Sequence, residues 1–118
     1  MKTIQEIANR LIDLVRKREF VQAYEELYSD DAKSIDPLNP DQEVLKGLIA
    51  LIHREKDFLS RTDIHQIKVS EPIIAGNYFT VSLTMDFTLS DRGKMLVDEL
   101  CVYKVADGKI ISQQFFVG

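Results

Sequence analysis

The sequence predicts an α+β fold in which three helices pack against one curved antiparallel sheet. Apolar residues recur with a helical period in the segments 3–17, 20–28 and 44–61. From Ile64 onward the period changes to two, which is typical of strands with one buried face. Helices that precede a run of antiparallel strands cover one face of their sheet. We therefore expect the order α-α-β-α-β-β-β-β in a single domain, residues 1–118, and the curved sheet should form a cone with an open mouth.

The first two segments are predicted to form a helical hairpin. Thr3 and Glu6 have the spacing of a capping box, which places the start of the first helix at Thr3. The charged residues 17–19 interrupt the apolar stripe, and a second helical period begins at Phe20. Two helices joined by so short a break are expected to pack side by side.

A polar break follows the second helix. The pair Asp30-Asp31 predicts a corner, and residues 32–35 a short strand that ends at Asp36-Pro37. A carboxylate held on such a stiff break is a candidate for acid or base chemistry. The alternative is that Asp36 only caps its own turn.

The third predicted helix, residues 44–61, carries Glu55 on its otherwise apolar side, and Gly47 weakens its first turn. Glu55 is a candidate for the lining of a pocket. The alternative is a solvated helix rim, because the surrounding residues 53–57 are highly charged. The two histidines show no ligand spacing, so no metal site is expected.

The second half of the chain reads as a series of hairpins. Six apolar residues alternate with polar ones in the segment 78–89, which predicts a strand with one buried face. Residues 90–93 supply a turn to the next strand, residues 95–105. An Asp-Gly pair at 107–108 predicts a tight turn before the last strand, residues 110–117.

Glu99 is the unusual residue on the predicted inner face of the sheet. A charged side chain in an apolar row is costly unless it is paired, protonated or lining a cavity, so Glu99 is a candidate pocket acid. The alternative is that local twist turns it to solvent. Its expected neighbours on the inner face are Phe79, Met85, Phe87, Cys101, Tyr103, Gln113 and Phe115, with Tyr24 and Tyr28 facing them from the second helix.

The predicted outer face is rich in apolar residues, namely Leu96, Leu100, Val102, Ile110 and Phe116. Apolar area on a nominally exposed face predicts burial against another copy of the chain. We therefore expect a homodimer through the sheet.

Composition restricts the function classes. A net charge of −4 argues against nucleic acid as a partner. No apolar run approaches the roughly 20 residues that a membrane span needs, and the N-terminus lacks the apolar core of a signal peptide. The single cysteine, Cys101, fits a reducing compartment, so a soluble cytoplasmic protein is expected. No phosphate-binding glycine motif is present, and no cofactor is expected.

The segment LYSDDAKSIDP, followed by a helix that opens near a glycine and by VYKVADGKIISQQFF, resembles the nuclear transport factor 2-like superfamily. Within it, the chain is most similar to SnoaL-like and ketosteroid-isomerase-like domains, which implies a cystatin-like cone. The resemblance implies that Asp36 is the general base. The isomerases hold the oxyanion with a first-helix tyrosine and a late-strand aspartate. This chain has neither at the matching positions, which argues against steroid isomerase activity.

The leading functional hypothesis is cofactor-free proton transfer on a small apolar carbonyl compound, of the isomerase or cyclase type. Asp36 and Glu99 are its candidate catalytic residues. The ligand-binding candidates are Tyr24, Tyr28, Glu55, Phe79, Met85, Phe87, Cys101, Tyr103, Gln113 and Phe115. The alternative is a non-catalytic ligand-binding or dimerisation module of the same fold, and a third possibility is a subunit of a larger assembly.

Overall fold

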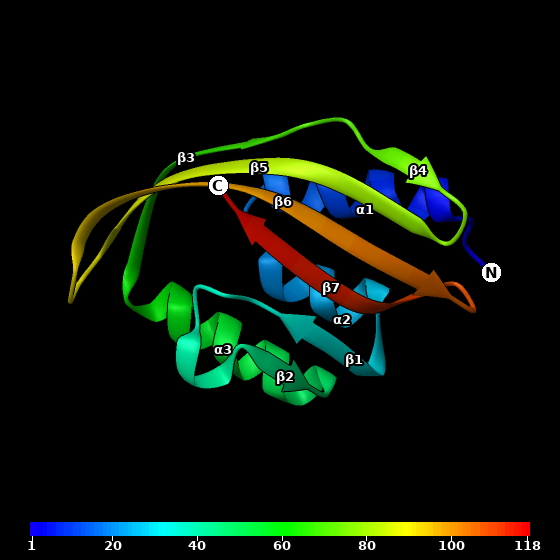
Figure 1. The fold of residues 1–118 in the computed structure, drawn as a ribbon, viewed down its shortest axis with the longest axis horizontal. Coiled ribbons are helices and arrows are strands. Elements are labelled where there is room, and N and C mark those ends of the chain that lie inside the picture. Colours follow the sequence, from blue (N-terminus) through cyan, green and yellow to red (C-terminus); the bar gives the residue numbers. More distant parts are fainter.

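A computed structural model describes all of residues 1–118 and shows three α-helices packed in a curved seven-stranded sheet (Figure 1). The predicted α+β cone is therefore confirmed. Its elements are α1 (Ile4–Arg16), α2 (Phe20–Leu27), β1 (Tyr28–Ile35), the 3₁₀ turn η1 (Pro40–Gln42), β2 (Val44–Lys46), α3 (Leu48–Ser60), β3 (Thr62–Val69), β4 (Ile73–Ala75), β5 (Tyr78–Leu89), β6 (Gly93–Ala106) and β7 (Lys109–Val117).

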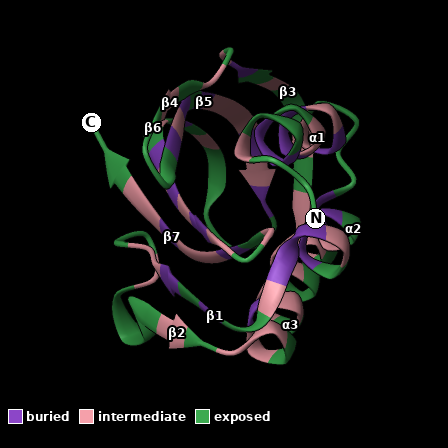
Figure 2. Ribbon diagram, turned by 90° about the vertical axis from the view of Figure 1, so that its right-hand side faces the viewer, coloured by how far each residue is buried: buried purple, intermediate pink, exposed green.

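The strands follow the order β2-β1-β7-β6-β5-β3, and β4 pairs with β5 beside β3. Seen from the end, the sheet curls around the helices, and the buried residues of both layers face each other (Figure 2). The prediction of a purely antiparallel sheet was wrong, because β1 runs parallel to β7. Alternation of apolar residues fixes which face of a strand is buried, but it carries no information on the direction of a distant partner.

The helical hairpin and its capping box are confirmed. The backbone N–H of Glu6 donates to Thr3 Oγ1 at 3.2 Å, and the Thr3 N–H donates to Glu6 Oε1 at 2.9 Å. The tight turn between β6 and β7 is also confirmed. Asp107 and Gly108 both have positive φ, 51° and 74°, as a two-residue turn matched to the twist of the strands requires.

The third helix begins at Leu48 rather than at residue 44. Residues 44–46 form β2, which pairs antiparallel with β1 at the edge of the sheet. Gly47 then turns the chain into α3 with φ of 103°, a value that favours glycine. A strand of three residues is too short to display a period of two, so the sequence predicts these residues as part of the third helix.

The predicted polar corner at Asp30-Asp31 was wrong as well. β1 begins at Tyr28, directly after α2, and both aspartates are exposed within the strand. The pairing of β1 with β7 shifts register between Tyr28 and Lys33, so the extra residues bulge outward. The polar pair marks this bulge.

Ile110 was placed on the outer face, and the structure buries it completely. The pairing of β6 with β7 shifts register between Lys104 and Val105, which sets Ile110 opposite Val105. A shift of one residue exchanges the two faces of a strand. The other outer-face predictions hold for Leu96, Leu100 and Phe116, which are 72%, 44% and 51% exposed.

No helix of the chain combines the length and the apolar character that crossing a bilayer demands.

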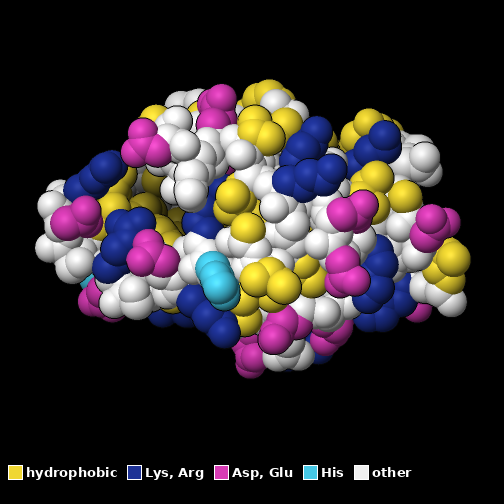
Figure 3. All heavy atoms as spheres, turned by 90° about the horizontal axis from the view of Figure 1, so that it is seen from below, with side chains coloured by type: hydrophobic (Ala, Val, Ile, Leu, Met, Phe, Trp, Pro, Cys, Tyr) yellow, Lys and Arg dark blue, Asp and Glu magenta, His cyan; other side chains and the backbone are white.

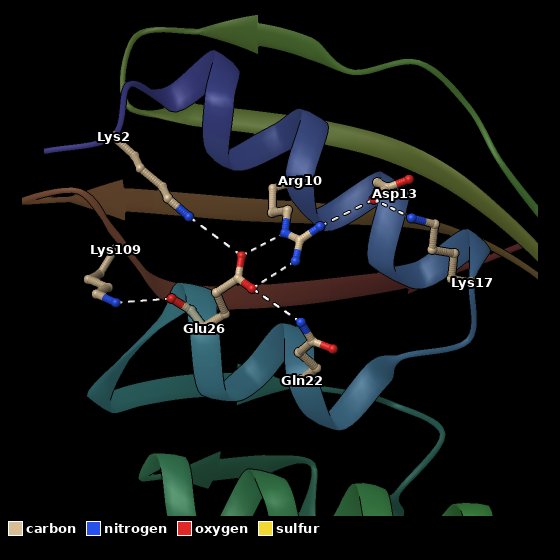
Figure 4. A network of polar contacts seen from close by, with 7 residues as sticks. All are labelled: Lys2, Arg10, Asp13, Lys17, Gln22, Glu26 and Lys109. Atoms are coloured by element: carbon tan, nitrogen blue, oxygen red, sulfur yellow. Dashed lines mark hydrogen bonds and ion pairs between the residues drawn. The ribbon is translucent and has the colours of Figure 1, made fainter.

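Glu26 ties α1, α2 and the start of β7 together on the surface (Figure 4). Its carboxylate accepts two hydrogen bonds from the Arg10 guanidinium, at 2.7 and 2.9 Å, and a weaker one from Lys2 at 3.5 Å. The Lys109 ammonium donates to the Glu26 carbonyl at 3.0 Å. Hydrogen bonds from Arg10, more than any other cause, lower the pKa of Glu26 to about 2. These polar contacts therefore hold α1 against α2 at the surface of the helical hairpin.

We expect Glu26→Gln to lower the free energy of unfolding at pH 7 by about 1 kcal/mol, because a bidentate pair within a network exceeds an isolated surface pair. The pKa of Glu26 is depressed, so its contribution is present above the ordinary value of 4.5 and is lost as the pH falls toward 2. Denaturant unfolding at pH 7 and pH 3 measures this. Glu25→Gln, on the exposed side of α2, is the control, and equal losses in both variants would contradict the prediction.

Candidate functional site

A buried polar network lies where α2, β1 and β7 meet. The Gln113 side chain on β7 is 1% exposed, and its Nε2 donates to the Tyr24 hydroxyl at 2.8 Å and to Ser34 Oγ at 3.1 Å. The Tyr28 hydroxyl donates to Gln113 Oε1. The rings of Tyr24 and Tyr28 also contact each other, with centroids 4.6 Å apart. Three of the predicted ligand-binding residues are therefore brought together by one amide.

Two members of this network were missed by sequence reasoning. Ser34 is fully buried on β1, and its Oγ also accepts a hydrogen bond from the Arg54 guanidinium at 2.8 Å. Arg54, on α3, reaches the Gln42 carbonyl as well, at 3.4 Å. The available signals were weak: Ser34 alternates with buried Ala32, and Arg54 lies three residues after buried Leu51. Arg54 was difficult to detect because it lies within the charged run of residues 53–57.

Glu99 lies on the inner face of β6, half-buried and opposite Leu83 of β5. The Cys101 thiol donates to Glu99 Oε1 at 3.7 Å, and no Lys, Arg or His side chain pairs with this carboxylate. Burial raises the pKa of Glu99 to about 7, and the negative charge of Asp36 adds to the shift. At neutral pH this carboxyl therefore exchanges between its two protonation states.

Glu55 of α3 is also half-buried, in line with the pocket alternative rather than a solvated rim. Burial raises the pKa of Glu55 to about 7; Arg54 opposes the shift and Asp36 adds to it. The charge of Asp36 thus raises the pKa of Glu55 as well as that of Glu99. The sequence predicts Asp36 and Glu99 as the catalytic residues. It leaves two roles open for Glu55, the lining of a pocket and a solvated helix rim.

Asp36 caps its own turn, as its alternative role predicted. Its Oδ1 accepts from the Leu38 N–H at 3.0 Å, and its Oδ2 accepts from Asn39 Nδ2 at 2.9 Å. These contacts fix the carboxylate at the end of β1. Both oxygens of Asp36 are therefore engaged by its own loop.

The aromatic candidates divide into two groups. Phe79 stacks on Tyr103 with centroids 4.8 Å apart, inside the main core. Phe87 belongs to a second cluster near the β5–β6 turn, where it contacts Phe58 edge-on at 5.6 Å. Half-buried Met85 packs against both clusters, and half-buried Phe115 against the main one.

The surface is hollowed toward the end of the molecule that carries the β5–β6 turn (Figure 3). Hydrophobic side chains form the wall of this hollow, and charged side chains stand at its rim.

Burial raises the pKa values of Tyr24, Tyr28, Tyr103 and Cys101, so these groups keep their protons at neutral pH. They act as hydrogen-bond donors and apolar surface. No three His, Cys, Asp or Glu side chains gather where they could hold a metal ion.

Comparison with solved structures gives full-length matches. A protein from Mesorhizobium loti, assigned as a SnoaL-like polyketide cyclase, superposes with a TM-score of 0.92 at 27% identity, covering 98% of this chain and 99% of the other. A protein from Bacillus subtilis, assigned as an isomerase, has a TM-score of 0.73 at 15% identity over 96% and 84%. A ketosteroid isomerase-like fold from Catenulispora acidiphila, in complex with trimethylamine, has a TM-score of 0.74 at 13% identity over 97% and 86%.

No curated protein sequence matches the chain. A family model described as a SnoaL-like domain matches residues 2–117, which is almost the whole sequence. The expected nuclear transport factor 2-like superfamily is thereby confirmed. This chain belongs to the SnoaL-like domain family.

Proposed function

We propose that the chain binds a small apolar carbonyl compound at the mouth of the cone and moves a proton next to its carbonyl group, without a cofactor. The observation that carries the proposal is Glu99: a carboxyl on an apolar sheet face, with no cationic partner and a pKa raised to about 7. A group whose pKa lies near the working pH is the most effective acid or base.

Glu99 acts as the base in this proposal. It takes a proton from the carbon beside the carbonyl, and the electron pair of the broken C–H bond moves into the enolate. A protonated carboxyl, which we assign to Glu55, returns a proton to a different carbon, so the product is an isomer. The charge of Asp36, which the turn holds in place, raises the pKa of both glutamates. Two acids of similar pKa can exchange the roles of donor and acceptor.

The relatives support this class of chemistry at a coarse level. The Mesorhizobium loti and Bacillus subtilis proteins are assigned to cyclisation and isomerisation, and both reaction types use proton transfer. The fold hosts many activities, so the carboxyl groups, and not the fold, carry the proposal for this chain.

Proton exchange on acetophenone tests the proposal directly. We expect the wild-type protein to accelerate deuterium incorporation into the acetophenone methyl group in D₂O, followed by NMR. Glu99→Gln should reduce the protein-dependent rate by about 100-fold or more, because it removes the base. Glu25→Gln should keep the wild-type rate. Absence of any protein-dependent exchange, or exchange that survives Glu99→Gln, would rule out this mechanism.

The raised pKa of Glu99 also predicts a pH-dependent stability. The folded protein holds this proton more tightly than the unfolded chain, so the stabilisation is complete below the ordinary value of 4.5 and is lost as the pH rises through about 7. Relative to wild type, Glu99→Gln should gain about 1–2 kcal/mol of unfolding free energy at pH 8 and little at pH 4, after allowance for partial exposure. Thermal unfolding at both pH values measures this, and a pH-independent difference would contradict it.

The alternative function is binding without chemistry, and the site suggests a ligand for it. The charge of Asp36 disfavours the ionisation of Glu55 and of Glu99, and an amine cation beside these groups would relieve that repulsion. The Catenulispora acidiphila neighbour is a complex with trimethylamine. If this alternative holds, trimethylammonium should bind more tightly at pH 8 than at pH 5 by calorimetry, and the acetophenone exchange assay should show no activity.

We also propose a homodimer through the outer apolar patch, defined as Leu96, Leu100, Val102 and Phe116. Leu100 and Phe116 are direct partners on β6 and β7, and Leu96 is the most exposed of the four. A contiguous apolar surface at the centre of a sheet favours burial against a second copy.

Light scattering should give wild-type protein a mass of two chains at micromolar concentration, and Leu100→Glu a mass of one, because the charge would be buried in the interface. Ile49→Glu, at an exposed apolar position on α3, is the matched control and should remain a dimer. A monomeric wild type would refute the dimer.

A further inference from the structure

Three lysines lie in one row across the outer face of the sheet. Lys46 on β2 is the cross-strand partner of Lys33 on β1. Lys33 pairs in turn with Ser112 on β7, and Ser112 pairs with Lys104 on β6. Paired residues of neighbouring strands lie on the same face of a sheet. The two residues that flank Lys33 on β1 are fully buried, so the row faces away from the helices.

Lys33 and Lys46 occupy the closest kind of cross-strand position. The N–H of Gly47 donates to the carbonyl of Ala32 at 2.8 Å, which makes the pair next to the lysines a hydrogen-bonded one. Hydrogen-bonded and non-hydrogen-bonded pairs alternate along an antiparallel ladder, so the lysine pair is of the second kind, with Cα atoms about 4.5 Å apart. Like charges directly opposite each other destabilise a sheet.

No carboxylate compensates for this repulsion. None of the three lysines forms an ion pair with an Asp or Glu side chain. Asp31, two residues before Lys33, accepts a hydrogen bond from a serine of its own bulge at 3.1 Å. The Lys104 ammonium lies 5.7 Å from the centre of the Tyr78 ring, which holds the cation without neutralising it.

Protection of the sheet edge explains only one of the lysines. A lysine on an edge strand discourages pairing with other chains, and β2 is such an edge. β1 and β6 are inner strands with a neighbour on each side, so Lys33 and Lys104 protect no edge. An oxyanion between Lys33 and Lys46 would instead replace the repulsion by two charge-assisted hydrogen bonds.

We propose that Lys33 and Lys46 bind the phosphate group of a small soluble ligand. The half-buried Ser112 side chain, beside Lys33 in the row, donates a third hydrogen bond, and Lys104 adds positive charge beyond it. Lysine is a compact, strongly charged donor that suits phosphate. The site lies on the face of the sheet opposite to Glu99, so it goes beyond the proposed proton transfer and does not depend on it.

Calorimetric titration with inorganic phosphate at pH 7.5 and constant ionic strength tests the site. We expect wild-type protein to bind one phosphate per chain. Lys33→Gln and Lys46→Gln should each weaken binding by about 10-fold, because each removes a charge-assisted hydrogen bond. Lys56→Gln, at an exposed position on α3, is the matched control and should keep the wild-type affinity. Absence of binding to wild type, or unchanged affinity in both variants of the pair, would overturn the proposal.

Thermal unfolding without phosphate gives a second measurement. Lys33→Gln and Lys46→Gln should each raise the melting temperature by about 1–4 °C, because each relieves the repulsion between the paired lysines. Lower melting temperatures in both variants would contradict the repulsion from which the site is inferred. Sedimentation with phosphatidylserine vesicles, by a protein that does not bind phosphate, would overturn the soluble ligand in favour of a membrane surface.

Discussion

The parallel pairing of β1 with β7 is the contact on which the rest of the molecule depends. It attaches the segment α2-β1-β2-α3 to the long β5–β6–β7 meander. Ser34 lies directly opposite Gln113 in this pairing. The buried polar network therefore spans this parallel pairing.

The region where β1 pairs with β7 is buried but polar, whereas a protein core is ordinarily apolar. Gln113, Ser34 and two tyrosine hydroxyls are buried together, and each forms a hydrogen bond with at least one other member. A network of this kind tolerates few alternatives, because the loss of one member leaves a buried group unpaired. It fixes the position of the Tyr24 hydroxyl oxygen.

Glu55 and Glu99 are unfavourably placed as charged groups. Both lose solvation through burial, and Asp36 adds a negative charge that the loop holds in place. Replacing either glutamate by an uncharged residue would stabilise the protein at alkaline pH, so we propose that function rather than folding accounts for their presence. Stability that is given up at a site in this way is common among enzymes and binding proteins.

The sequence by itself determined the α+β class, the helical hairpin with its capping box, and the inner face of β5 and β6, including Glu99. These features are local, since periodicity, caps and tight turns are determined by residues that lie close together in the sequence. Only the tertiary structure decided the direction of β1, the burial of Ile110, and the convergence of Tyr24, Ser34, Arg54 and Gln113. The first and the last depend on contacts between segments far apart in the chain. The burial of Ile110 depends on a one-residue register shift that no local pattern specifies and that exchanges the two faces of the strand.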